Sequence, residues 1–186
     1  MTAGSGIVHQ EMPSGDENGR IWGMQLWSNL PASHKMMPPR YREVKKAAIP
    51  VLGMENGVAV KVIAGSLGGA EGPVRDVVTE PELLDISIPE NSEFRHDIPS
   101  GHAVFAYMIE GEASFDEDFV GAETTVIFGE GDEIIARTGE RRARFLLVSG
   151  KPIGEPVAWH GPIVMNTQEE LEKAFDELNK GTFIKG

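Results

Sequence analysis

The stretch LLDISI (Leu83–Ile88) decides the fold that we expect for this chain. Its apolar and polar residues alternate, with Leu84, Ile86 and Ile88 on one side and Asp85 and Ser87 on the other. Residues two apart in a β-strand point to the same face, so this pattern is typical of a strand with one apolar and one polar face. We therefore predict a strand here, with its apolar face turned toward a core.

Further apolar runs lie on both sides of this strand and are separated by glycine and proline turns. They are Val58–Ala64, Ala103–Phe115 with a break near Gly111, Thr124–Phe128, Glu133–Ala136 and Ala143–Ser149. Short strands at this spacing predict an antiparallel sandwich or barrel. The length of 186 residues and the hydrophobic content of 40% suit one domain with a sizeable core, or one domain plus part of another.

The charge of the chain argues against direct nucleic-acid binding. The formal net charge is −12, and an acidic surface repels phosphate backbones. One basic cluster occurs, formed by Arg141, Arg142 and Arg144, but Glu140 lies beside it. We interpret this cluster as a solvated strand edge.

The absence of cysteine from the sequence excludes disulfides, thiolate metal sites and cysteine nucleophiles. The start of the chain has neither the basic region nor the apolar run of a signal peptide, and no apolar stretch approaches membrane-spanning length. These features predict a soluble, cytoplasmic protein with no membrane partner.

The two ends of the chain differ from its centre. Ile21–Leu30 predicts a strand that Pro31 ends, and the proline-rich segment Pro31–Pro50 predicts an extended connector and a domain boundary. Thr167–Glu170 (TQEE) predicts a helix start with a capping box, and Gly181 predicts its end. The apolar face of this helix is expected to pack on the barrel wall, with partner binding as the alternative.

A candidate metal site lies in GSGIVHQEMP (Gly4–Pro13). His9 and Glu11 are two residues apart, so on a strand the imidazole and the carboxylate would converge on one spot. Such a pair would form half of a non-haem metal site, and the alternative is a polar pair at a strand end that faces solvent.

Several motifs, in order along the chain, resemble the pirin family. They are MTAGSGIVHQE (Met1–Glu11), QLWSNLP (Gln25–Pro31), the K-M-x-x-P-R-Y run (Lys35–Tyr41), IAGSLGGAEGPV (Ile63–Val74) and EPVAWHGPIVMNTQEEL (Glu155–Leu171). These matches run from end to end of the chain, which makes chance resemblance improbable.

The resemblance implies a bicupin, that is, two small β-barrels in tandem. It implies an N-terminal barrel that binds one metal, usually iron, through three histidines and a glutamate, and a C-terminal barrel that is usually empty. Some pirins resemble quercetin 2,3-dioxygenases in activity. Eukaryotic pirins act as nuclear transcriptional co-regulators, which adds the nucleus to the expected location if the source is a eukaryote.

The chain departs from the family pattern at its start. Two of the family's histidines lie in an H-x-H-x-G-F-E-T segment upstream of the M-T-A-G stretch, and this chain has no H-x-H. We therefore expect a truncated first barrel, with residues 1–50 as its remnant plus connector and residues 51–186 as a C-terminal cupin barrel with a terminal helix. His9 and Glu11 match the third histidine and the glutamate, so the resemblance makes them metal ligands for Fe(II) and makes Glu11 a candidate catalytic base.

We interpret the other histidines as surface or structural residues and not as metal ligands. We expect His34 to be exposed in the connector, and His96 and His102 to be surface residues flanking the turn Asp97–Gly101. We interpret His160 as structural, hydrogen-bonded in a turn. Because the second barrel lacks an H-x-H strand, we predict no metal there.

Two functions from different classes fit these observations. The first is an iron-dependent dioxygenase of quercetinase type, acting on a flavonol-like aromatic substrate, with its metal site incomplete in this chain. The alternative is a non-catalytic cupin binding or regulatory module. Removing strands from a barrel uncovers an apolar face, so we also expect Trp22, Met24, Leu26 and Trp27 to be exposed and to favour a protein partner or self-association.

Overall fold

The computed structural model describes residues 1–184 and divides the chain into two compact units. One unit is Glu43–Pro152, and the other combines Met1–Arg42 with the segment that begins at Ile153. These are units of packing, and the domain boundary at residue 50 stays a prediction. Within residues 1–184, no helix is both long enough and apolar enough to cross a bilayer.

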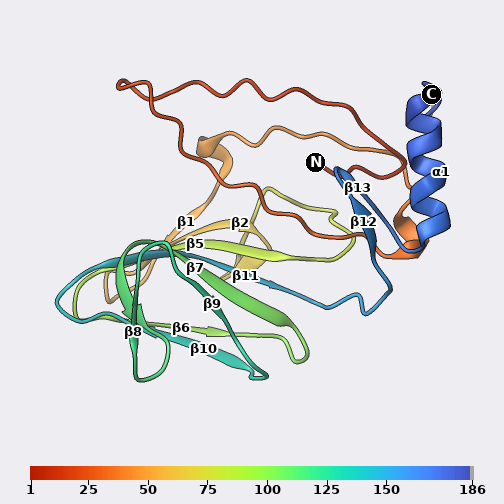
Figure 1. Ribbon diagram of the computed structural model, residues 1–186. Helices are drawn as coiled ribbons and strands as arrows, with labels where there is room; N and C mark the ends of the chain where they lie inside the picture. Colours follow the sequence, from red (N-terminus) through yellow and green to blue (C-terminus); the bar gives the residue numbers. More distant parts are fainter. Residues whose placement is uncertain (185–186) are drawn as a thin grey trace. The chain divides into compact units, whose positions relative to one another are not determined.

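The unit Glu43–Pro152 is built on one antiparallel sheet (Figure 1). Its strands follow the order β1-β2-β5-β11-β7-β10-β6, and β8 and β9 also pair with β7. The bounds are β1 Val51–Gly53, β2 Ala59–Ala64, β5 Glu82–Ile88, β6 Glu93–Asp97, β7 Ala103–Ser114, β8 Phe119–Gly121, β9 Thr125–Ile127, β10 Glu133–Arg137 and β11 Ala143–Gly150. A small hairpin, β3 Ser66–Leu67 and β4 Ala70–Glu71, lies between β2 and β5 in the chain.

The long strand β7 pairs with different strands along its length and so connects the two parts of the sheet. Its first part pairs with β11 on one side and with β9 on the other, whereas its last residues pair with β8 and β10. The predicted break near Gly111 is a β-bulge, because the register between β7 and β11 shifts between Arg144 and Phe145. Gly111 has a φ of +69°, and a Cβ there would lie 1.8 Å from the carbonyl oxygen of Arg142. Only glycine fits such a close approach in the left-handed region.

The alternation in LLDISI reports the core correctly. Leu84, Ile86 and Ile88 are all at most 1% exposed. They belong to a cluster of fully buried side chains from five strands and the loop before β2: Val58, Val60, Val62, Leu84, Ile86, Ile88, Phe94, Met108, Phe145 and Leu147. Such burial is the main term that stabilises a fold of this size.

The polar face of β5 is less exposed than its pattern predicts. Asp85 is 6% exposed because Lys61 covers it from β2 and Arg144 covers it from β11. The Asp85 carboxylate accepts hydrogen bonds from Lys61 Nζ at 2.7 Å and from Arg144 Nε and Nη2 at 2.9 and 2.8 Å. Burial by itself would raise the pKa of Asp85, but these bonds and charges outweigh it and hold the pKa below its ordinary value. The prediction of a solvated edge position is therefore wrong for Arg144, which is bonded to a buried carboxylate.

The strand predicted over Ile21–Leu30 is wrong, because this segment has no regular secondary structure. The segment is in none of the described strand pairs, and an extended segment becomes a strand only as part of a hydrogen-bonded ladder. The connector that follows is mainly irregular, with two short 3-10 helices, η1 Ala32–His34 and η2 Lys46–Ala48. The exposure predicted for this region is confirmed, since Trp22 and Trp27 are 66% and 59% exposed.

The predicted C-terminal helix is α1 Gln168–Asn179, and it begins with the expected capping box. Thr167 Oγ1 accepts the backbone N–H of Glu170, and the Glu170 carboxylate accepts that of Thr167. The helix packs on the hairpin β12 Ala158–His160 and β13 Ile163–Met165, where Leu171, Ala174 and Ile163 are buried together. The surface that it covers is therefore this hairpin, and its packing on the barrel wall stays a prediction.

Candidate metal centre

His9 and Glu11 converge, although the strand expected to hold them does not form. Residues 9–11 have no regular secondary structure, yet His9 Nδ1 lies 4.0 Å from Glu11 Oε1. The two side chains are 29% and 66% exposed. An imidazole and a carboxylate thus present their donor atoms to the same solvent-facing region.

Backbone contacts with residues 37–40 hold this N-terminal segment in place. Thr2 and Arg40 exchange two backbone hydrogen bonds of 2.7 and 2.9 Å, and Ser5 N–H donates to Met37 O at 2.9 Å. Gly4 makes the approach feasible, because its φ is +51° and a Cβ there would lie 2.1 Å from Met37 O.

These contacts also bring Tyr41 beside the candidate site. The His9 and Tyr41 rings lie 6.2 Å apart between centroids, at an interplanar angle of 45°. Tyr41 belongs to the K-M-x-x-P-R-Y run, so the structure unites two motifs that are separate in the sequence. Spacing could not reveal this neighbour of His9, because long-range backbone pairing creates it.

The donor types of the pair suit iron, but their number does not complete a site. Neutral imidazole nitrogen and carboxylate oxygen are the ligands of non-haem Fe(II), which needs at least a facial triad of protein ligands. Within residues 1–184, no three or more His, Cys, Asp or Glu side chains gather in a way that could hold a metal ion. His9 and Glu11 could therefore supply two ligands, and the others would have to come from outside these residues.

The prediction for His96 is wrong, because this residue is buried rather than at a surface turn. His96 is 9% exposed on β6, and its Nε2 lies 2.7 Å from Glu82 Oε2. Ser149 Oγ donates to the same carboxylate oxygen at 3.4 Å. The polar sequence of β6 hid the strand, although Phe94 and His96 alternate with polar neighbours as the inward residues of a strand do.

The three remaining histidines lie in different settings. His34 is exposed, as predicted. His102 is half-buried, and its Nδ1 is enclosed without a hydrogen-bond partner among the described residues. His160 ends β12, and its ring packs edge-on against Phe175 at 5.3 Å between centroids. None of them lies in a cluster that could complete the His9–Glu11 pair within residues 1–184.

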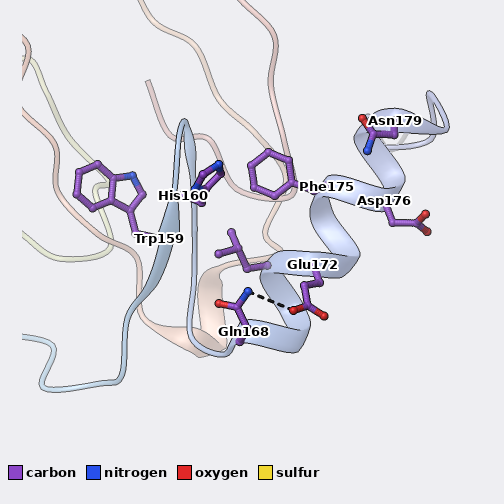
Figure 2. Close-up of a pocket in the computed structure, with 8 residues that line it drawn as sticks. Trp159, His160, Gln168, Glu172, Phe175, Asp176 and Asn179 are labelled. Atoms are coloured by element: carbon purple, nitrogen blue, oxygen red, sulfur yellow. Dashed lines mark hydrogen bonds between the residues drawn. The ribbon is translucent and has the colours of Figure 1, made fainter.

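A groove of about 440 Å³ lies between the β12–β13 hairpin and α1 (Figure 2). Its lining combines apolar, aromatic and acidic side chains: Trp159, His160, Gln168, Leu171, Glu172, Phe175, Asp176 and Asn179. Neither His9 nor Glu11 is among them, so the groove is separate from the candidate metal ligands.

An antiparallel barrel of this topology defines a cupin. A crystal structure of a quercetin 2,3-dioxygenase from Acinetobacter baumannii has the same fold, with a TM-score of 0.77 and 30% sequence identity. The similarity covers 83% of this chain and 54% of that one. The Pirin C-terminal cupin domain matches residues 83–184. The chain belongs to the pirin family.

Relatives from distant organisms extend this similarity over nearly the whole chain. A pirin-like protein from Caulobacter vibrioides is 41% identical over 184 residues, which is 98% of this chain. Pirin-1 from Arabidopsis thaliana is 42% identical over 183 residues, or 95% of this chain. The chain spans 66% and 62% of the lengths of these two relatives.

Proposed function

We propose that this chain contributes His9 and Glu11 to an iron site of quercetin 2,3-dioxygenase type, completed by two histidines from outside these residues. The observation that carries the proposal is the 4.0 Å approach of His9 Nδ1 and Glu11 Oε1 in a member of the pirin family. The similarity to the Acinetobacter baumannii quercetin 2,3-dioxygenase supports the reaction class. The substrate would be a flavonol-like aromatic enediol.

Each residue has a distinct role in this proposal. Bound Fe(II) would supply the Lewis acidity and redox chemistry that an oxygen-dependent ring cleavage requires. His9 would bind through a neutral ring nitrogen, with the Tyr41 ring limiting where the imidazole can turn. Glu11, at 66% exposure, is open to a substrate hydroxyl and could accept its proton.

Iron loading tests the proposal directly. We expect this chain alone to retain less than about one-tenth of an equivalent of iron after anaerobic loading, because two ligands do not hold the metal. Joining an upstream H-x-H segment should raise the content to at least about half an equivalent and should restore oxygen uptake with quercetin.

The matched variants are His9→Gln and Glu11→Gln in the extended protein, with His34→Gln as the control. His34 is an exposed histidine of the same unit, so its loss should leave iron content unchanged. Loss of either ligand should weaken iron binding at least about 10-fold. If all three variants bound iron equally, the pair would not be ligands.

The alternative is a non-catalytic binding or regulatory module, and the exposed apolar residues of Met1–Arg42 favour it. Trp22 and Trp27 are joined by Met24 and Leu26, at 40% and 45% exposure, in one short segment. Such a strip marks an interaction surface or a site of self-association. An iron-free extended protein that sediments as a dimer, with the monomer restored by Trp22→Ser and Trp27→Ser, would support this alternative over the enzyme.

A further inference from the structure

The groove between the β12–β13 hairpin and α1 has an apolar floor and an acidic rim. Leu171 is 4% exposed at the base, and the Phe175 ring packs edge-on with His160 across the groove. Figure 2 shows His160 and Phe175 facing each other from the hairpin and the helix, with Gln168 and Glu172 at the lower edge. The helix therefore uses part of its apolar face for packing and leaves part of it open.

Charge in the groove is one-sided. Its carboxylates belong to Glu172 and Asp176, and neither Lys nor Arg lines it. Asp176 is already paired with Lys180 at 2.6 Å, whereas Glu172 accepts a hydrogen bond from Gln168 Nε2 at 3.2 Å. No lysine or arginine of residues 1–184 forms an ion pair with Glu172. Glu172 is therefore the anionic group of this groove that is most open to a cation.

We propose that the groove binds a basic segment of a partner protein, in which an apolar side chain precedes or follows a lysine or arginine. The apolar side chain would lie mainly on the half-buried Phe175 ring, with the nearly buried Leu171 beneath it at the base of the groove. The cation would pair with Glu172 by a charge-assisted hydrogen bond, within reach of the Phe175 ring face. Charge complementarity selects this occupant, because an acidic or neutral segment would leave Glu172 unpaired.

This proposal goes beyond iron chemistry, because none of the groove residues is a candidate metal ligand. The binding is therefore expected from the iron-free chain, and a failure of iron loading would leave it untouched. In the same way, a failure of peptide binding would leave the metal proposal standing.

Isothermal titration calorimetry tests the groove with two peptides of about 14 residues, one amphipathic in leucine and lysine and the other with glutamate in place of lysine. We expect the lysine peptide to bind with a Kd of about 10–100 μM at about 0.15 M salt and the glutamate peptide to bind at least about 10-fold more weakly. Equal binding of the two peptides would overturn the proposal.

The acidity of the whole chain requires a control for unspecific attraction. Glu172→Gln should weaken the lysine peptide about 5- to 10-fold, because it removes the direct partner of the cation. Glu117→Gln removes the same charge from an exposed turn of the Glu43–Pro152 unit and should change Kd by less than about twofold. If the two variants weakened binding equally, the attraction would be general and the site would not exist.

A second variant tests the apolar half of the groove without removing the ring's volume entirely. Phe175→Leu keeps the helix packed while it removes the aromatic face, so we expect about a 3-fold or larger loss of affinity. Amide chemical shifts should change in α1 and β12 and stay unchanged in β5 and β11. Shift changes spread over both units would contradict a defined groove.

Discussion

The barrel unit Glu43–Pro152 and the segment Met1–Arg42 both contain large apolar residues. These residues differ in burial between the two regions. In the barrel, Phe94 and Phe145 are fully buried, whereas Trp22 and Trp27 in the segment are more than half exposed. The barrel strands pair with neighbouring strands, whereas residues 21–30 belong to no described strand. The comparison teaches that apolar sequence becomes core only where strand pairing closes a surface over it.

Phe145→Ala should give the largest effect of this comparison. It removes a fully buried ring that packs edge-on with Phe115 at 5.3 Å, so the barrel should lose about 3–5 kcal/mol of stability. Hydrogen exchange of the β5, β7 and β11 amides measures this loss. Trp22→Ala, which removes a ring that is 66% exposed, should change stability by less than about 0.5 kcal/mol. Similar losses for the two variants would refute the contrast between the regions.

Gly111→Ala should disrupt the bulge that allows β7 to pair with strands in both parts of the barrel. A Cβ would lie 1.8 Å from Arg142 O at a backbone position with φ of +69°, so we expect a loss of about 2–4 kcal/mol. Urea unfolding followed by circular dichroism measures it. The control is Gly121→Ala, because a Cβ at Gly121 meets nothing within 4 Å. A stable Gly111→Ala protein would mean that the bulge can relax.

Asp85→Asn should weaken the barrel by about 1–2 kcal/mol near neutral pH, since Lys61 and Arg144 lose their charged partner. The folded-state pKa of Asp85 is held below its ordinary value. Its contribution is therefore present above the unfolded pKa of about 3.9 and is lost as the pH falls through the lower folded pKa.

The variant should accordingly flatten the acid limb of a plot of stability against pH. Urea unfolding at several pH values checks this, with the exposed Asp116→Asn as the control. An unchanged acid limb would show that the buried carboxylate contributes no pH dependence.

Thr167→Ala should have the smallest effect and should act outside the barrel. It removes the hydroxyl that accepts the Glu170 N–H, so α1 should lose about 1 kcal/mol. Helical circular dichroism during thermal unfolding reports the loss. Thr167→Ser keeps the oxygen and should restore most of the stability; if it fails to do so, packing rather than capping explains the threonine.

Local patterns were good predictors wherever one residue's neighbours along the chain determine the outcome. The alternation of Leu84, Ile86 and Ile88 gave the correct inward face, and the Thr167–Glu170 box gave the correct helix start. The pattern failed for His96, since a polar strand with one buried histidine resembles a turn in sequence. It also failed for Asp85, whose cover comes from two neighbouring strands.

The ligand role of His9 and Glu11 stays a prediction, and the surroundings of the pair were not predictable from the sequence. Spacing and family resemblance pointed to His9 and Glu11, and their convergence at 4.0 Å agrees with a shared direction. The approach of Tyr41 depends on backbone bonds between Thr2 and Arg40, which no local pattern contains. The groove on α1 was likewise hidden, because it needs the hairpin on its other side.

By itself, the sequence of this protein determined its family, its β-rich cupin fold, the capped helix and the pair of candidate ligands, because each is carried by residue identity and short-range periodicity. Tertiary structure alone decided which apolar residues are covered, which acids are paired and where the helix leaves a groove. These outcomes depend on long-range strand pairing, which brings residues together at distances that no spacing along the chain encodes.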